Sequence, residues 1–446
     1  MTDTPRSDDV STRLLRIAKL AREAPTRALT TLAHHIDVEF LREAYRRTRK
    51  DGAVGVDGQT AIEYAKKLEA NLQLLLDRFK TGTYRAPPVR RVHIPKGDGS
   101  KTRPIGIPTF EDKVLQRAVS MVLDAIYEQD FQPGSYGFRP RRSAHGALKQ
   151  LRDNLMEMGG GWVLEVDIKG YFDALVHGHL REFLDNRVRD GVLRCAIDKW
   201  LKAGVMEEGR LTRPETGSPQ GGVISPILSN IYLHEVLDLW FEETVKPRLK
   251  GRAFMVRFAD DFVLVFALES DARRVFDVLP KRFGKYGLTL HPEKTRLVRF
   301  CRPCSSGAGK GRDAQGESPG TFDLLGFRHF WSRSRRGFWV IKQQTMPSRF
   351  TRALRRFAEW CRRNRHRPIT EQRSEIVLKL QGHYAYYGIT GNSVALDRFR
   401  HAVLCCWRKW LHRRSQRSLM TWATFNKLLE HHKVPPARCV HSIYVT

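Results

Sequence analysis

Residues 257–264 read RFADDFVL, in which two apolar, strand-like runs enclose the adjacent acids Asp260 and Asp261. This pattern predicts a β-hairpin with both acids at or beside its turn. Paired carboxylates are costly to bury unless a cation compensates their charge. The turn is therefore a candidate site for a divalent metal. The alternative is an exposed hairpin whose acids are simply solvated, and this stretch alone leaves both possibilities open.

A second apolar run, Trp162–Ile168, carries Asp167 near its end, shortly before Gly170. A strand that ends in an acid, together with a hairpin that carries two, is what two-metal phosphoryl transfer requires. In that chemistry one Mg²⁺ lowers the pKa of an attacking hydroxyl, and the other, about 4 Å away, stabilises the leaving pyrophosphate. Mg²⁺ prefers carboxylate oxygens combined with substrate phosphates. The two elements together indicate a nucleotidyl-transfer site.

The composition of the 446-residue chain favours a polyanionic partner. Its formal net charge is +30, its pI is near 10.2, and 41% of its residues are hydrophobic. A surplus of this size attracts nucleic acid or an anionic surface. There is no run of 18 apolar residues and no secretory signal, and seven scattered cysteines, Cys301 and Cys304 included, indicate ordinary thiols. We expect a cytosolic, nucleic-acid-binding protein that does not enter a membrane.

Helical and strand-like patterns interleave along the chain. Residues 11–50 and Ile62–Phe79 have helical periodicity, and Val89–Ile94 is strand-like and leads into a turn at residues 96–99. Further strands and helices alternate over residues 85–330. This order predicts the α+β fold class.

The C-terminal segment 345–446 is predicted to be helical and is strongly basic, with 20 Lys and Arg against 5 Asp and Glu. It is either a solvated helical face or a surface that binds RNA through charge and stacking. The basic residues considered for RNA binding are Arg355, Arg356, Arg362 and Arg363. The aromatic residues considered for stacking are Trp360, Tyr384, Tyr386, Tyr387, Trp407, Trp410 and Trp422.

Three motifs lie in this order along the chain: the Asp167 strand, the loop GSPQGGVISP at 217–226 and the FADD box at 258–261. Together they resemble the palm of a reverse transcriptase, and most closely that of the group II intron-encoded reverse transcriptase/maturases. Further blocks follow in the family's order: GVDG at 55–58, RPIGIP at 103–108, YGFRP at 136–140, GLTL at 287–290 with Lys294-Thr295, LGF at 325–327 and YYGITGN at 386–392. One departure is Phe258, where the family most often has Tyr. This change is expected to spare metal binding and to affect primer contacts or fidelity.

The resemblance assigns roles to the acids and to one aromatic residue. Asp167 and Asp260 match the carboxylates that bind both Mg²⁺ ions, and Asp261 matches the third acid of the catalytic triad. Phe172 matches the steric gate, an aromatic ring that lies where a ribose 2′-hydroxyl would project. Its other interpretation is a core aromatic at the end of a strand.

Four more residues are expected to contact the incoming nucleotide. Arg103 and Lys96 match finger residues that hold the triphosphate, which suits their charges; Lys96 fits a turn lysine beside Asp98 equally well. Gln220 matches a residue that packs against the nucleotide. Lys294 is placed either near the leaving pyrophosphate or in solvent.

The resemblance implies a right-hand polymerase with a helical maturase region. We expect a basic helical extension at 1–34, interleaved fingers and palm at 35–340, and a helical thumb and maturase (X) region at 341–446. The implied function is an RNA-directed DNA polymerase encoded by a group II intron, which binds the intron RNA, assists its splicing and copies it into cDNA during retrohoming.

The expected partners are intron RNA, an RNA template, a DNA primer or target and dNTPs, and a homodimer is left open. The expected location is the bacterial cytoplasm, with the nucleoid, rather than an organelle. Because no paired CxxC motifs precede Thr446, we expect no zinc-dependent endonuclease domain. The primer would then come from elsewhere, for example from a nascent strand at a replication fork.

Two other functions fit the same motifs. One is a non-enzymatic splicing maturase with a vestigial polymerase site, against which the intact Asp167, Asp260 and Asp261 argue. The other is a group II-like reverse transcriptase adopted by a defence or diversity-generating system, which the gene neighbourhood would identify.

Overall fold

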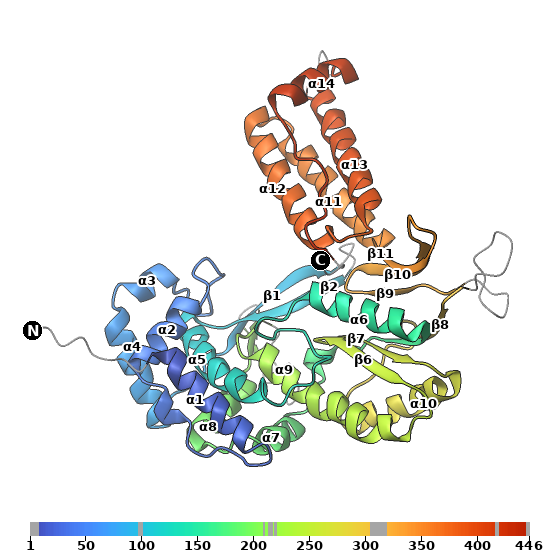
Figure 1. Cartoon of the computed structure of the whole chain (residues 1–446). Helices are drawn as coiled ribbons and strands as arrows, with labels where there is room; N and C mark the ends of the chain where they lie inside the picture. Colours follow the sequence, from blue (N-terminus) through green and yellow to red (C-terminus); the bar gives the residue numbers. More distant parts are fainter. Residues whose placement is uncertain are drawn as a thin grey trace, which may run out of the picture. The chain divides into compact units, whose positions relative to one another are not determined.

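The computed structural model describes residues 9–96, 101–207, 210–212, 217, 221–303, 319–414 and 419–442. The chain divides into two compact units (Figure 1). Unit 1 comprises Met1–Ala147 and Val166–Arg296, and unit 2 comprises Leu148–Glu165 and Leu297–Thr446. Each unit is thus built from two separate stretches of the chain.

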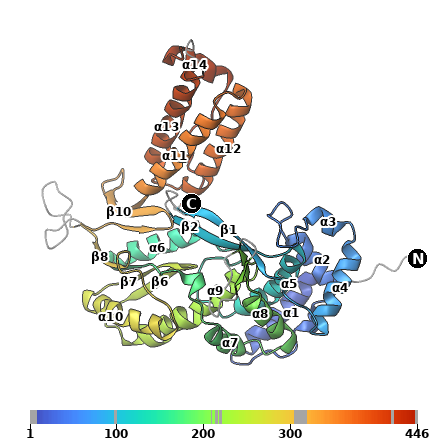
Figure 2. The ribbon, with the colours of Figure 1, turned by 180° about the vertical axis from the view of Figure 1, so that it is seen from behind.

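Helices surround the strands of unit 1. In chain order they are α1 (Val10–Glu23), α2 (Val38–Arg47), α3 (Ala61–Ala65), α4 (Leu68–Lys80), α5 (Phe110–Tyr127), α7 (His177–Asp185), α8 (Gly191–Lys202), α9 (Ser225–Leu233) and α10 (Glu269–Lys285). Helix α5 is buried along most of its length, and α1 and α2 pack against it (Figure 2). It begins after Thr109, whose hydroxyl accepts a hydrogen bond from the backbone of Asp112.

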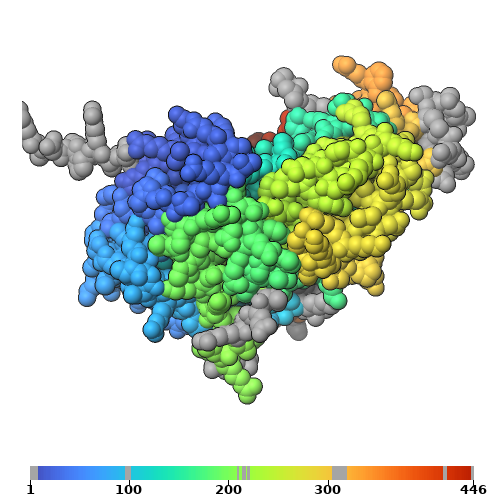
Figure 3. Space-filling model, turned by 90° about the horizontal axis from the view of Figure 1, so that it is seen from below, coloured from blue at the N-terminus to red at the C-terminus, as the bar shows by residue number. Residues whose placement is uncertain are grey.

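Arg187 joins the N-terminal helix to the rest of unit 1. It is buried, and its guanidinium donates to the carboxylate of Asp130 at 2.7 Å and to the backbone carbonyl of Ala21 at 2.7 Å. The N-terminal residues therefore lie against the end of α7, and Figure 3 shows their blue surface beside the green surface of residues near 190.

A four-stranded sheet in unit 1 has the order β2-β1-β4-β5. Its strands are β1 (Val89–Lys96), β2 (Lys101–Ile107), β4 (Val205–Glu207) and β5 (Arg210–Thr212). β1 pairs antiparallel with β2 and parallel with β4. The predicted strand at Val89–Ile94 is therefore confirmed.

The acids of the RFADDFVL stretch lie in a hairpin of unit 1. Strands β6 (Ala253–Phe258) and β7 (Asp261–Phe266) pair antiparallel, with Phe258 opposite Asp261. β7 is buried from Phe262 to Phe266, and α10 packs on it. This confirms the prediction of a hairpin around the two acids.

Unit 2 begins with most of α6 (Ala144–Met158) and of β3 (Gly160–Val166), which neighbours β8 (Arg296–Cys301). Its second sheet has the order β11-β10-β9, from β9 (Phe322–Leu324), β10 (Phe327–Arg333) and β11 (Trp339–Thr345). α6 packs against β11, since Arg152 donates to the carbonyl of Ile341 and Gln343 donates to the carbonyl of Leu148.

The C-terminal part of unit 2 is a helical bundle, as predicted. Its helices are α11 (Pro347–Asn364), α12 (Ile369–Tyr387), α13 (Ser393–His412) and α14 (Trp422–His431). Trp407 is fully buried at its centre, where its indole N–H donates to Gln372 at 2.9 Å. Apolar side chains of all four helices pack around it.

The aromatic residues of this bundle correct the predicted stacking surface. Tyr384 and Trp407 are 4% and 0% exposed, and Trp360, Tyr387 and Trp410 are partly buried against the same core. These five rings pack in or against the interior of the bundle, whereas Trp422 on α14 is 45% exposed, so most but not all of the predicted stacking surface is excluded. In contrast, Arg355, Arg356, Arg362 and Arg363 are all exposed on α11.

Two predicted helices are interrupted. The stretch 11–50 forms α1 and α2, because Pro25 follows the end of α1 and cannot continue it. The stretch Ile62–Phe79 forms α3 and α4, which break at Lys66 and Lys67. The expected boundaries near residues 34 and 340 stay predictions, because compactness alone does not separate fingers, palm and thumb.

No helix within the described ranges has the length and apolarity needed to span a bilayer.

Candidate active site

One acid of the hairpin lies in a tight two-residue turn, and the other begins the strand that follows. Ala259 and Asp260 connect β6 to β7, and Asp261 is the first residue of β7. Ala259 has a φ of 57°, a conformation that a non-glycine residue rarely adopts. Two-residue hairpin turns need a positive φ at their first central position in order to match the strand twist. The turn leaves Asp260 half-buried and Asp261 exposed.

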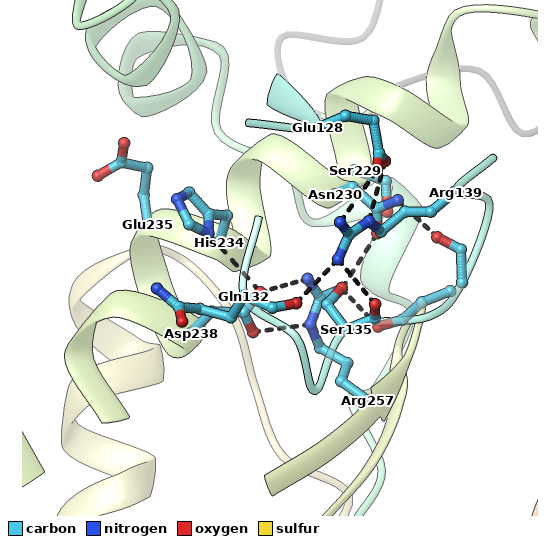
Figure 4. A network of polar contacts seen from close by, with 12 residues as sticks. Glu128, Gln132, Ser135, Arg139, Ser229, Asn230, His234, Glu235, Asp238 and Arg257 are labelled. Atoms are coloured by element: carbon cyan, nitrogen blue, oxygen red, sulfur yellow. Dashed lines mark hydrogen bonds and ion pairs between the residues drawn. The ribbon is translucent and has the colours of Figure 1, made fainter. Parts of the chain in front are cut away.

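A buried ion pair on the interior side of the hairpin fixes this turn. Arg257 and Asp238 are both 0% exposed, and the guanidinium meets the carboxylate through Nε–Oδ1 at 2.8 Å and Nη2–Oδ2 at 2.5 Å (Figure 4). Nη1 of Arg257 also donates to Asn230 Oδ1 and to the carbonyl of Ala259, each at 3.1 Å. The guanidinium therefore links the turn to the helix behind it.

Asp238 lies in an unusual helical segment. α9 continues into π-helical turns at His234–Asp238 and Trp240–Val245. Burial is the largest single influence and would raise the pKa of Asp238, but the charges and hydrogen bonds of Arg257 and His234 together hold the pKa below its usual value. Asp238 is therefore ionised at neutral pH, and the positive charge of Arg257 balances its negative charge.

Residues 134–137 run alongside β6 and support the turn. The carbonyl of Gly134 accepts from the backbone N–H of Arg257 at 2.9 Å, and the N–H of Tyr136 donates to the carbonyl of Arg257 at 2.8 Å. A Cβ on Gly137 would lie 2.2 Å from the backbone nitrogen of Ala259. Only glycine allows this approach, and Asn230 fixes it by donating to the Gly137 carbonyl at 2.7 Å.

Arg139 anchors the far end of the same segment. Its buried guanidinium binds both carboxylate oxygens of Glu128 at 2.9 Å and donates to the carbonyls of Gln132 and Ser135 (Figure 4). All these contacts of Arg139 are made within the protein, and they fix the YGFRP block next to the turn.

Asp167 directly follows β3 and pairs with a cation. Its carboxylate forms an ion pair with Lys294, and its backbone carbonyl accepts from the N–H of His291 at 2.8 Å. Lys169 donates through its N–H to the carbonyl of Thr289 at 2.8 Å. The GLTL block therefore lies beside Asp167, and Lys294 forms an ion pair with this acid although its side chain is 57% exposed.

Phe172 lies in a short 3₁₀ turn, Tyr171–Asp173, just after Asp167. Its half-buried ring meets the buried ring of Tyr171 edge-on, with centroids 5.3 Å apart. Tyr171 is fixed by its hydroxyl, which donates to the carbonyl of Ser229 at 2.7 Å. Burial raises the pKa of Tyr171.

The glycine loop is described at its two ends. Gly217 donates to the carbonyl of Leu175 at 2.8 Å, and a Cβ on it would come within 3.2 Å of the backbone of Phe172. Gly221 approaches β2 so closely that a Cβ would lie 2.7 Å from the carbonyl oxygen of Gly106. The loop thus starts beside Phe172 and returns beside β2. Gln220 lies outside the described residues.

A buried polar chain on α5 orders the end of this loop, and the sequence analysis missed it. Gln116 accepts hydrogen bonds from the backbone N–H groups of Val223 and Ile224 at 2.8 and 3.3 Å. Gln116 in turn donates to Asp112 at 3.1 Å, and Asp112 also accepts from Trp200 at 2.8 Å. Burial raises the pKa of Asp112 to about 6. The available signal was that Asp112 and Gln116 are four residues apart and so lie on one face of α5.

The two finger candidates lie on the hairpin of β1 and β2. Arg103 is exposed and lies opposite Ile94. Lys96 ends β1 opposite Lys101, and its side chain lies outside the described part of the chain. Arg355, Arg356, Arg362 and Arg363 belong to unit 2.

The donors around the turn suit a hard divalent cation. Carboxylates are the ligands that Mg²⁺ prefers, and the ion pair between Lys294 and Asp167 shows that a positive charge is accommodated at this acid. Within the described ranges, no three His, Cys, Asp or Glu side chains lie together where they could hold a metal ion, so the structure does not gather Asp167, Asp260 and Asp261 into one such group. A bound ion would therefore take further ligands from substrate phosphates, as Mg²⁺ commonly does.

Comparison with known proteins identifies relatives over half of the chain or more. A family model described as reverse transcriptase (RNA-dependent DNA polymerase) matches residues 94–329. Protein YkfC of Escherichia coli (strain K12) is 36% identical over 300 residues, which cover 58% of this chain and 76% of YkfC. Group II intron-encoded protein LtrA of Lactococcus lactis subsp. cremoris is 38% identical over 228 residues, which cover 50% of this chain and 37% of LtrA.

Among solved structures, a telomerase from Candida albicans in complex with a telomeric RNA fragment matches with a TM-score of 0.43 and 13% identity. The match covers 84% of this chain and 66% of the telomerase chain. A likeness this distant carries no argument about the site.

We expect Asp238→Asn to destabilise unit 1 strongly, because it leaves the buried charge of Arg257 uncompensated. Removing one partner of a buried ion pair costs about 3–5 kcal/mol, which urea unfolding of the full chain measures. The control is Asp277→Asn on the exposed side of α10, which should change stability by less than about 0.5 kcal/mol.

The same variant has a pH signature. The folded-state pKa of Asp238 lies below its unfolded value, so its stabilisation is present above roughly pH 4 and is lost as the pH falls through the folded pKa. The advantage of the natural protein over Asp238→Asn should therefore shrink on acidification. An advantage that does not change with pH, or a cost below about 1 kcal/mol, would contradict the assigned role of this pair.

Proposed function

The chain belongs to the reverse transcriptase (RNA-dependent DNA polymerase) family, of the group II intron reverse transcriptase/maturase kind, and we propose that it extends a DNA primer along an RNA template at the β6–β7 turn. The observation that carries this proposal is the rigid turn itself. Arg257, Gly137 and Asn230 hold Asp260 and Asp261 at a tight turn whose position their contacts define. An acidic turn held this rigidly suits catalysis better than a solvated hairpin.

Asp167, Asp260 and Asp261 would hold two Mg²⁺ ions. When bound, these ions lower the pKa of the primer 3′-hydroxyl and stabilise the leaving pyrophosphate. Lys294 neutralises Asp167 until then, which limits repulsion among the acids. Once Asp167 binds metal instead, the ammonium group of Lys294 could form an ion pair with the leaving pyrophosphate beside the same carboxylate.

The other residues of the site position the nucleotide. Phe172, fixed against Tyr171, presents the ring that would exclude a ribose 2′-hydroxyl. Arg103, and Lys96 with it, would bind the triphosphate from the β1–β2 hairpin. Gln220 would pack on the nucleotide, in a loop whose end Gln116 orders through the N–H groups of Val223 and Ile224.

A second role, assistance of intron splicing, rests on the basic face of α11. Arg355, Arg356, Arg362 and Arg363 are exposed there, and we propose that they bind the phosphates of intron RNA. The RNA would then be copied into cDNA during retrohoming. Because the aromatic rings of the bundle are largely buried, this binding depends on charge more than on stacking.

Asp260→Ala should reduce primer extension on an RNA template with Mg²⁺ and dNTPs to background, because it removes an acid from the metal-binding turn. The measurement is gel-resolved extension of a labelled primer. Asp277→Ala, which removes an acid of similar charge from α10, should extend normally. Near-normal extension by Asp260→Ala would refute the assignment of the active site.

Phe172→Val should raise the incorporation of ribonucleotides relative to deoxynucleotides by on the order of 10- to 100-fold, because the shorter side chain leaves space for the 2′-hydroxyl. Single-nucleotide incorporation with rNTP and dNTP measures this ratio. Phe172→Tyr keeps the ring and should keep the natural selectivity. If Phe172→Val is folded and equally selective, Phe172 has only a packing role.

Replacing Arg355, Arg356, Arg362 and Arg363 together with Ala should weaken intron RNA binding and reduce the slope of log affinity against log salt by up to about four, roughly one per lost phosphate contact. The matched variant Asp260→Ala with Asp261→Ala should bind and splice the RNA while making no cDNA. Normal RNA binding by the four-Arg variant across salt concentrations would show that this face is only solvated.

A further inference from the structure

Strained backbone is concentrated at the candidate active site. In the described ranges, the non-glycine residues with positive φ are Phe138, Arg141, Ala259 and Leu325. Three of them belong to the catalytic turn or to the segment that supports it. Such conformations persist where the surrounding structure imposes them, and they are concentrated at functional sites.

Phe138 combines this backbone conformation with a large aromatic side chain. Its φ is 57°, which is an outlier for a bulky side chain, and yet the ring is 54% exposed. Packing of the ring in the protein core therefore does not explain why an aromatic residue, rather than glycine, occupies this position.

The neighbours of Phe138 leave its backbone no freedom to relax. Gly137 lies directly against the nitrogen of Ala259, and Arg139 is 3% exposed and bound to Glu128 (Figure 4). The chain is thus clamped on both sides of Phe138. The ring is held outward, one residue away from the contact with the catalytic turn.

Of the arginines that follow Phe138, two bind within the protein and one is exposed. Arg139 is buried, and Arg142 lies over the ring of Tyr136 at 5.1 Å and donates to the carbonyl of Pro133 at 3.0 Å. Arg141 is exposed and has a φ of 59°. The segment therefore presents one aromatic ring and one guanidinium outward, beside the acids.

We propose that Phe138 stacks on a base of the template–primer duplex next to the primer end and that Arg141 binds a phosphate of the same duplex. The proposal rests on the proposed function. Every base has a π-face, so an outward ring beside the reaction site binds nucleic acid without regard to sequence. A guanidinium three residues later supplies the charge that the backbone of the duplex requires.

The first test measures binding of a fluorescent RNA–DNA hybrid by the full chain. Phe138→Ala should weaken binding roughly 5- to 150-fold, the range of base–aromatic stacking, whereas Phe138→Trp should bind nearly as the natural protein does. Phe276→Ala, which removes a partly exposed ring from α10, should leave binding unchanged. Arg141→Ala should lower the salt slope by about one.

Phe138→Gly separates stacking from a structural role. Glycine adopts positive φ without strain, so this variant should melt at a higher temperature than the natural protein and still bind the hybrid as weakly as Phe138→Ala. If Phe138→Gly binds the hybrid normally, the ring does not stack on a base.

An abasic site moved through both strands near the primer end locates the stacked base. At the position of the stacked base, the abasic site should lower the affinity of the natural protein for the hybrid. At the same position it should not further lower the affinity of Phe138→Ala, which has already lost the ring. If the abasic site and Phe138→Ala lower the binding affinity additively at every position, the stacking proposal is overturned. If that occurs while Asp260→Ala still abolishes extension, the proposed function stands without this contact; if the natural protein neither binds nor extends the hybrid, both proposals fail.

Discussion

The buried ion pair between Arg257 and Asp238 is the constraint on which the candidate active site depends. An arginine with no exposed surface requires a partner for its charge and for each of its donors. Asp238 supplies the charge, and Asn230 and the carbonyl of Ala259 accept the remaining hydrogen bonds. Because the guanidinium reaches both the helix and the turn, the position of Asp260 is determined from behind the strand rather than from the solvent side.

Close backbone contacts bring the other parts of the site to this turn. Gly137 lies against Ala259, Gly217 against the segment of Phe172, and Gly221 against β2. Side chains would prevent each of these approaches. The glycines of the family blocks thus have a physical explanation here, since they allow these chain segments to approach their neighbours closely.

The parts of the site that depend on local sequence were predictable. Alternating apolar residues around Asp260 and Asp261 specify a hairpin, and the apolar run before Asp167 specifies a strand, because strand burial follows from side chains on neighbouring positions. The aromatic residues of the last 100 residues show the limit of such patterns. An amphipathic helix rich in both Arg and Trp fits either a stacking surface or a packed bundle, and only packing shows that Trp407 faces inward.

The sequence by itself determined the acids, the hairpin that carries two of them, the basic character of the chain and the family to which its motifs belong. These properties follow from residues close together in the chain. Only the tertiary structure decided that Arg257 pairs with Asp238, that Lys294 lies on Asp167 and that Gln116 binds the backbone at Val223. Each of these contacts joins residues 19 to 127 positions apart, and the partner of a buried polar group over such separations depends on how the helices and strands pack, which no local pattern encodes.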